Sequence, residues 1–82
     1  AINRALAVAE VDGPGAALDT MPDIARDARL ASYQPYWAAR AELLGRWGAA
    51  MEAREAYDMA IGLERDLVVR RFLLKRKATL AN

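Results

Sequence analysis

The chain has 82 residues, 55% of them hydrophobic, and carries a formal net charge of +1. This length allows one small domain, and the absence of cysteine and histidine excludes disulfides, thiolate sites, and the commonest general base and metal ligand. Its apolar runs are too short for a transmembrane helix or a secretory signal peptide, so we expect no membrane segment.

Residues 2–21 predict a short helical hairpin. Residues 2–11 are rich in alanine and place their apolar side chains on one stripe, which favours a helix. Gly13 suits a left-handed cap and Pro14 the first turn of a following short helix. The chain begins within this helical pattern and without an initiator methionine, so we interpret residues 1–82 as a single domain from the C-terminal part of a longer polypeptide.

A longer hairpin is expected over residues 35–63. Pro35 suits the first turn of its first helix, and Gly48 separates that helix from the second one. Small residues on the facing sides would let the two backbones approach closely, while larger side chains fill the remaining volume. Apolar and small side chains at helical spacing form this stripe: Trp37, Ala41, Leu44, Ala53, Tyr57 and Ala60.

The longer hairpin resembles a tetratricopeptide (TPR) unit, whose signature begins Trp-x2-Leu-Gly-x2-Tyr and continues with Ala-x3-Phe. Trp37 keeps the first position, and Ala53 with Tyr57 keeps the later pair with one aromatic exchanged for another. The other positions depart from the signature, and they hold Arg40, Ala41, Leu44 and, in place of the terminal proline, Arg65. We therefore expect an all-α domain of about five helices built from TPR-like hairpins.

An offset of 35 residues relates the two hairpins, because it aligns Gly13 with Gly48. The stripes align as well, with Ile2 on Trp37, Leu6 on Ala41, Ala9 on Leu44, and Leu18 on Ala53. The usual TPR period is 34 residues, and one extra residue fits in the connector. The sequence thus indicates tandem units, with two unrelated Ala-rich hairpins as the alternative.

Residues 66–81 predict a last helix that caps the array, with Asp66 as its N-cap. Its core face is expected to hold Val69, Phe72, Leu73, Arg76 and Leu80. Leu67, Val68 and Leu74 fall outside that face. This excess apolar surface predicts a contact with the rest of the parent chain or with a second copy in a homodimer.

Charge is distributed unevenly along the chain. Residues 1–64 hold six arginines and ten acidic residues, whereas residues 65–82 hold six basic residues and one acidic residue. The cluster Lys75, Arg76 and Lys77 is therefore a candidate nucleic-acid contact. The alternative is that these cations occupy the solvated face and the C-terminal end of a helix, where the helix dipole favours them.

The residues give poor support for catalysis, and we expect neither an enzyme nor a bound cofactor or metal. The hydroxyl side chains have no histidine to activate them. Glu52, Glu55 and Asp58 lie at helical spacing, but they alternate with Arg54 on the face opposite the apolar stripe. This arrangement favours a solvated helix face over a metal or acid–base site.

Four residues are candidate contacts for a protein partner: Tyr33, Arg40, Trp47 and Leu74. Trp47 stands just before the break at Gly48, where it would serve as a lid on the hairpin or as an exposed anchor. Aromatic rings interleaved with arginine could also stack nucleobases. Trp37 and Tyr57, however, fit the core stripe better.

Five segments, taken in order, resemble the C-terminal TPR-like extension of bacterial RNA polymerase sigma factors of the extracytoplasmic-function (ECF) type. The most distinctive is the opening from Asn3 to Pro14, which follows the pattern Asn-Arg-Ala-x-Ala-Val-Ala-Glu-Val-x-Gly-Pro. The others are Tyr33-Gln34-Pro35, Ala38 to Arg46, Glu52 to Tyr57, and Arg70 to Leu73. The resemblance covers nearly the whole chain.

This resemblance implies a bacterial, cytoplasmic protein whose preceding regions bind core RNA polymerase and promoter DNA. Residues 1–82 would then be a regulatory, non-catalytic protein-interaction module acting in transcription initiation. Nucleic-acid contact through the basic last helix, and a free-standing TPR scaffold, are the alternatives. No residue of this chain corresponds to the promoter-reading or polymerase-binding regions.

Overall fold

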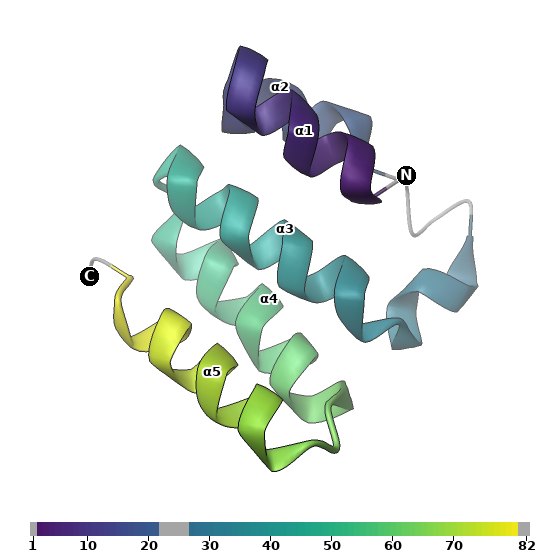
Figure 1. Ribbon diagram of the computed structural model, residues 1–82, viewed down its shortest axis with the longest axis vertical. Helices are drawn as coiled ribbons and strands as arrows, with labels where there is room; N and C mark the ends of the chain where they lie inside the picture. The colour runs from purple at the N-terminus through teal and green to yellow at the C-terminus, as the bar shows by residue number, and fades with distance from the viewer. Residues whose placement is uncertain (1, 22–26, 81–82) are drawn as a thin grey trace.

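The computed structural model describes residues 2–21 and 27–80, with the backbone alone for residues 2–6. Within these ranges the chain is all-α, with five α-helices, one short 3-10 helix and no strand. The helices α3, α4 and α5 lie side by side, and α1 with α2 packs on the other flank of α3 (Figure 1). The elements are α1 (Ile2–Asp12), α2 (Pro14–Thr20), η1 (Ala28–Ser32), α3 (Gln34–Trp47), α4 (Ala50–Leu63) and α5 (Leu67–Ala78).

Two glycines with positive φ form the turns inside the two hairpins. Gly48 ends α3 in the left-handed conformation, with φ 97° and ψ 7°. Gly13 joins α1 to α2 with φ 92° and ψ 167°, so it is not the left-handed cap that its position predicted. Residues with a Cβ rarely adopt such angles. The carbonyl of Leu44 accepts hydrogen bonds from the N–H groups of Gly48 at 3.1 Å and Ala49 at 3.0 Å, so the end of α3 is closed before α4 begins.

Capping and side-chain hydrogen bonds set the starts of α3 and α5. The Asp66 carboxylate accepts a hydrogen bond from the N–H of Val68 at 2.9 Å, which confirms Asp66 as the N-cap of α5. Pro35 lies in the first turn of α3. The Trp37 indole N–H donates to the Ala31 carbonyl at 3.0 Å and so ties η1 to the start of α3.

The main core lies between α3, α4 and α5, and α3 packs most extensively against α4. Five of the six stripe residues expected in the longer hairpin are buried there, and Trp37 is partly buried against them. The alanines allow this close approach, as predicted. The buried members of this core are Ala41, Leu44, Ala53, Ala56, Tyr57, Ala60, Ile61 and Leu73.

A second, smaller core joins α1 and α2 to α3. Leu43 and Ala17 are fully buried in it, and Val8, Ala9, Leu18 and Met21 pack around them. The α3 helix therefore contributes to both cores, with Leu43 in the second one and Ala41 and Leu44 in the main one. The side chains of Ile2 and Leu6, which the 35-residue offset aligns with the longer hairpin, lie outside the described residues.

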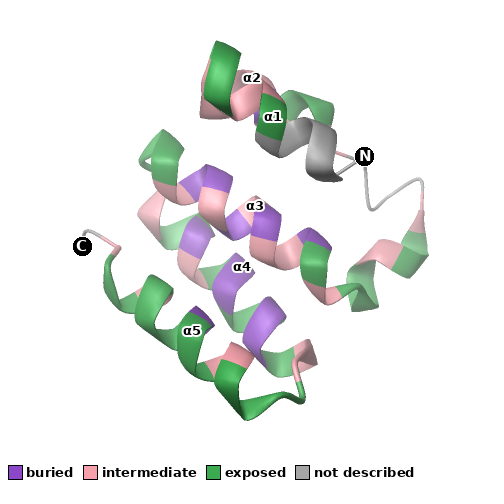
Figure 2. Ribbon diagram, viewed as in Figure 1, coloured by how far each residue is buried: buried purple, intermediate pink, exposed green. Residues whose placement is uncertain are grey.

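The core face of α5 differs from the predicted one at Phe72. Val69, Leu73 and Leu80 pack on the main core, but Phe72 has 59% of its surface exposed. Phe72 and Leu73 follow Val69 by three and four residues, and neighbouring residues of a helix point in different directions. The side of α5 that packs on α4 is the one that carries Leu73, so Phe72 points away from the core. Phe72 therefore joins the outward side of α5, which is mostly exposed (Figure 2).

Candidate protein-interaction surfaces

The outward side of α5 is an apolar surface with two cations in it. Leu67, Val68, Phe72 and Leu74 are exposed by 69%, 74%, 59% and 49%. Arg71 and Lys75 are exposed beside them, and neither forms an ion pair within the described part of the chain. We call these six residues the α5 outer face. Leu74, one of the predicted partner contacts, belongs to it.

The predicted basic cluster divides between two roles in the structure. Arg76 forms an ion pair with Glu42 of α3 at 2.7 Å, and Lys77 forms one with Asp58 of α4 at 2.7 Å. Lys75 lies on the α5 outer face and forms no ion pair with a residue that the structure describes. Two of the three candidate nucleic-acid contacts therefore help to hold α5 on its neighbours.

Glu42 is the centre of an ion-pair cluster that links three helices. Its carboxylate accepts hydrogen bonds from Arg46 Nε at 3.0 Å and from Arg76 at 2.7 Å, and Arg46 also pairs with Glu10 of α1 at 3.4 Å. Burial alone would raise the pKa of Glu42, but the hydrogen bonds and charges of Arg76 and Arg46 outweigh it. The pKa of Glu42 is thus held below its ordinary value of 4.5.

This depressed pKa predicts an acid-sensitive contribution to stability. Because the folded pKa of Glu42 lies below the unfolded one, the contribution is complete above pH 4.5 and is lost as pH falls through the folded pKa. We expect Glu42→Gln to lower the free energy of unfolding by about 1 kcal/mol at pH 7. Urea unfolding from pH 7 to pH 3 should show this difference shrinking towards zero. A difference that stays constant over that range would exclude the electrostatic origin.

Trp47 lies over the first turn of α2. Its side chain is 62% exposed, yet its ring is so close to Gly15 that a Cβ on that glycine would lie 2.4 Å from a ring carbon. The ring also lines a shallow hollow with Asp12 and Asp19. The sequence left open whether Trp47 is a lid on its own hairpin or an exposed anchor. In the structure the ring contacts α2 of the other hairpin, and most of its surface still faces outward.

A double-mutant cycle tests this contact. Gly15→Ala alone should displace the Trp47 ring and change its fluorescence, with little net gain in stability. In a Trp47→Ala background the same change should stabilise by about 0.5 kcal/mol, because only the helix propensity of alanine remains. Gly62→Ala is the matched control, since a Cβ there meets nothing within 4 Å. Equal effects of Gly15→Ala in both backgrounds would rule out the contact.

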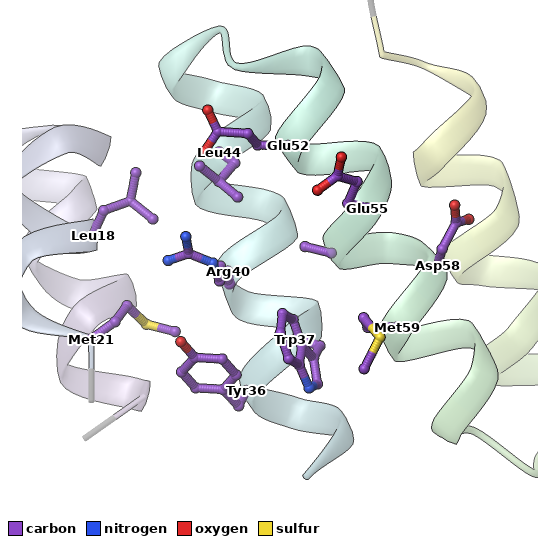
Figure 3. A pocket seen from close by; sticks show the side chains of 11 residues that line it. Leu18, Met21, Tyr36, Trp37, Arg40, Leu44, Glu52, Glu55, Asp58 and Met59 are labelled. Carbon is purple, nitrogen blue, oxygen red and sulfur yellow. The ribbon is translucent and has the colours of Figure 1, made fainter. Parts of the chain in front are cut away.

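A groove with a volume of about 750 Å³ runs between α2, α3 and α4. Figure 3 shows Arg40, another predicted partner contact, directed towards Leu18 and Met21, whereas Glu52 and Glu55 project from α4. We call this feature the α2–α4 groove. The sequence placed these carboxylates on a solvated face, and they are exposed, but it gave no sign that they form the edge of a groove.

The four predicted partner contacts do not form one site. Arg40 lines the α2–α4 groove, Trp47 covers α2, and Leu74 lies on the α5 outer face. Tyr33 is half-exposed before the first turn of α3. Among the described residues, no three acidic side chains cluster in a way that would hold a metal ion, and no described helix is long and apolar enough to cross a membrane.

Comparison with known proteins gives one match to a much longer bacterial protein. Over 62 residues, or 76% of this chain, the sequence is 44% identical to an uncharacterized protein of Rhizobium meliloti (strain 1021). The aligned region covers 14% of that protein, so the chain spans about one seventh of its relative. No family model and no solved structure matches the chain.

Proposed function

We propose that this chain is a TPR-like, C-terminal extension of a bacterial ECF-type sigma factor and acts as a protein-interaction module in transcription initiation. The ordered resemblance of its five segments supports this function. The similarity to part of a much longer bacterial protein is compatible with a segment that works within a larger polypeptide. Gly13 and Gly48, which the 35-residue offset aligns, both have positive φ, although only Gly48 is left-handed.

The observation that carries the proposal is the α5 outer face. Four large apolar side chains on one short helix are left about half or more exposed. Full burial of one such side chain is worth about 1.5–3 kcal/mol, so covering several of them would contribute substantially to binding. Several exposed apolar side chains on one helix face are typical of interaction sites.

In this proposal α5 occupies the place of the first helix of a third repeat unit. A helix in that place leaves its outer side free for the next layer of an array. The next layer would come from another domain of the parent sigma factor or from RNA polymerase. The mechanism is a face-to-face helical contact that positions the parent protein during initiation.

The first test is the identity of the parent polypeptide. The complete open reading frame and the intact mass of the native protein should reveal a promoter-binding helix-turn-helix region ahead of this chain. A native protein without such a region would end the sigma-factor proposal and favour a free-standing TPR adaptor.

The second test addresses the α5 outer face in the intact native protein. Leu67→Ser with Leu74→Ser should weaken binding to core RNA polymerase about tenfold or more, or reduce transcription in a purified system, with little change in melting temperature. Val11→Ser is the matched control, because Val11 is 83% exposed on α1. Equal activity of all three proteins would remove the α5 outer face from the proposal.

Nucleic-acid contact through α5 is the second candidate. Arg71 and Lys75 favour it, because neither pairs with an acidic residue in the described part of the chain. The four exposed apolar side chains around them suit a protein partner better than a phosphate backbone, which binds mainly through charged and polar groups. If DNA is the partner, Arg71→Gln with Lys75→Gln should abolish a steeply salt-dependent binding. These positions are preferable to Arg76 and Lys77, whose loss would also loosen α5.

A further inference from the structure

The α2–α4 groove has an apolar floor formed by three helices. Leu18 and Met21 come from α2 and its C-cap, Trp37 and Leu44 from α3, and Met59 from α4 (Figure 3). Leu44 is buried and the others are partly or largely accessible. Methionine side chains adapt to the shape of different apolar partners, so this floor suits a side chain inserted from outside.

The α4 edge of the groove is acidic. Glu52 and Glu55 are exposed, and neither forms an ion pair with any residue that the structure describes. Asp58 continues the row but is already paired with Lys77 at 2.7 Å. The two unpaired carboxylates lie three residues apart on α4, which separates them by about one helical turn. They can therefore face two cations that are also one turn apart.

Trp37 adds a restrained aromatic surface to the same groove. Its indole N–H donates a hydrogen bond to the Ala31 carbonyl at 3.0 Å. The rings of Tyr36 and Trp37 also make an edge-to-face contact, with their centroids 5.3 Å apart. Both contacts restrain the ring. The face of a restrained indole in this groove attracts the ammonium or guanidinium group of a bound side chain.

We propose that the α2–α4 groove binds a basic amphipathic helix of a partner protein. Apolar side chains of that helix would lie on Leu18, Trp37 and Met59, and lysines or arginines one turn apart would pair with Glu52 and Glu55. Arg40, directed towards the α2 side in Figure 3, restricts the basic side of the ligand to the α4 edge. The exposed carboxylates disfavour nucleic acid at this site.

A second copy of this chain is the competing occupant, because its α5 outer face carries Arg71 and Lys75 one turn apart. That contact would join the groove of one copy to the α5 outer face of the next, so a dimer would still have one free groove and one free α5 outer face. Such a heterologous contact gives a closed assembly only if the rotation between copies completes a ring; otherwise further copies keep adding. A helix from another protein can fill the groove without any ring of copies having to form.

The test uses two synthetic peptides of about 18 residues that can form helices on binding. One carries leucine on one face and lysine elsewhere, and the other has glutamate in place of each lysine. Each is titrated into the ¹⁵N-labelled chain while the two indole N–H resonances are followed. The Leu/Lys peptide should shift the Trp37 resonance and leave that of Trp47 nearly unchanged, and the Leu/Glu peptide should shift neither.

Matched double variants separate the groove from general charge effects. Glu52→Gln with Glu55→Gln should weaken binding of the Leu/Lys peptide about fivefold to tenfold. Asp12→Asn with Asp19→Asn removes the same number of charges outside the groove and should leave the affinity unchanged. Far-UV circular dichroism checks that both variants keep their helices.

Three results would overturn the proposal. The first is equal binding of the two peptides, and the second is equal weakening by the two acidic double variants. The third comes from sedimentation equilibrium of the chain alone. If it self-associates, and both the Glu52/Glu55 variant and Arg71→Gln with Lys75→Gln abolish this, the occupant is a second copy. The α5 outer face is not part of the groove, so either of the first two results leaves the proposed function standing. The third result would also assign the α5 outer face to a second copy, and the polymerase-binding test above then decides the proposed function separately.

Discussion

Replacing Leu43 with alanine is expected to lower the free energy of unfolding by about 2–5 kcal/mol. Leu43 has 0% of its surface exposed, and it is the largest fully buried side chain in the described part of the chain. A domain of this size is stabilised by only about 4–12 kcal/mol in total. The loss of one side chain therefore removes a large part of the stability, and urea unfolding monitored by circular dichroism measures it.

The position of Leu43 also predicts where the damage begins. Leu43 belongs to the small core that holds α1 and α2 on α3, whereas the main core lies between α3, α4 and α5. Amide hydrogen exchange in Leu43→Ala should accelerate first in α1 and α2, through local opening of that unit. Leu74→Ala, at an exposed leucine, should change stability by less than about 0.5 kcal/mol. Uniform acceleration across all helices would contradict two separable cores.

The sequence predicted the helices well because their signals are local. Glycines at positive φ, a proline in a first turn and an aspartate N-cap each act within a few residues. Gly48, Pro35 and Asp66 all serve in the structure as their positions predicted. The stripe of the longer hairpin was also predictable, since two helices joined by a short turn must bury their apolar faces against each other.

The features that the sequence did not reveal depend on residues far apart in the chain. The pair between Glu42 and Arg76 spans 34 residues, and no periodicity indicates that these two side chains meet. The α2–α4 groove likewise needs the docking of α2 beside α3 and α4. Phe72 was assigned to the wrong side of α5. It lies three residues after Val69, a spacing that fits the core side or the outer side of the helix, and only the packing of α5 on α4 shows which side is buried. Long-range packing thus determined the candidate sites.

Replacing Ala53 with leucine is expected to destabilise the domain by about 1–3 kcal/mol. Ala53 is fully buried in the main core, with Ala41 and Leu44 of α3 in the same cluster. Leucine has almost the helix propensity of alanine, so α4 itself should remain as favourable as before. The cost comes from the added side-chain volume, which must push α3 away from α4 or force side chains out of their preferred rotamers.

The expected fall in melting temperature is about 4–24 °C, because 1 kcal/mol corresponds to about 4–8 °C in a domain of this size. Ala7→Leu makes the same chemical change at an exposed position of α1 and should leave the melting temperature nearly unchanged. An Ala53→Leu variant as stable as the Ala7→Leu control would mean that the interface between α3 and α4 has room for a larger side chain. The alanines would then not be needed for close packing, and the physical basis for comparing this hairpin with a TPR unit would be lost.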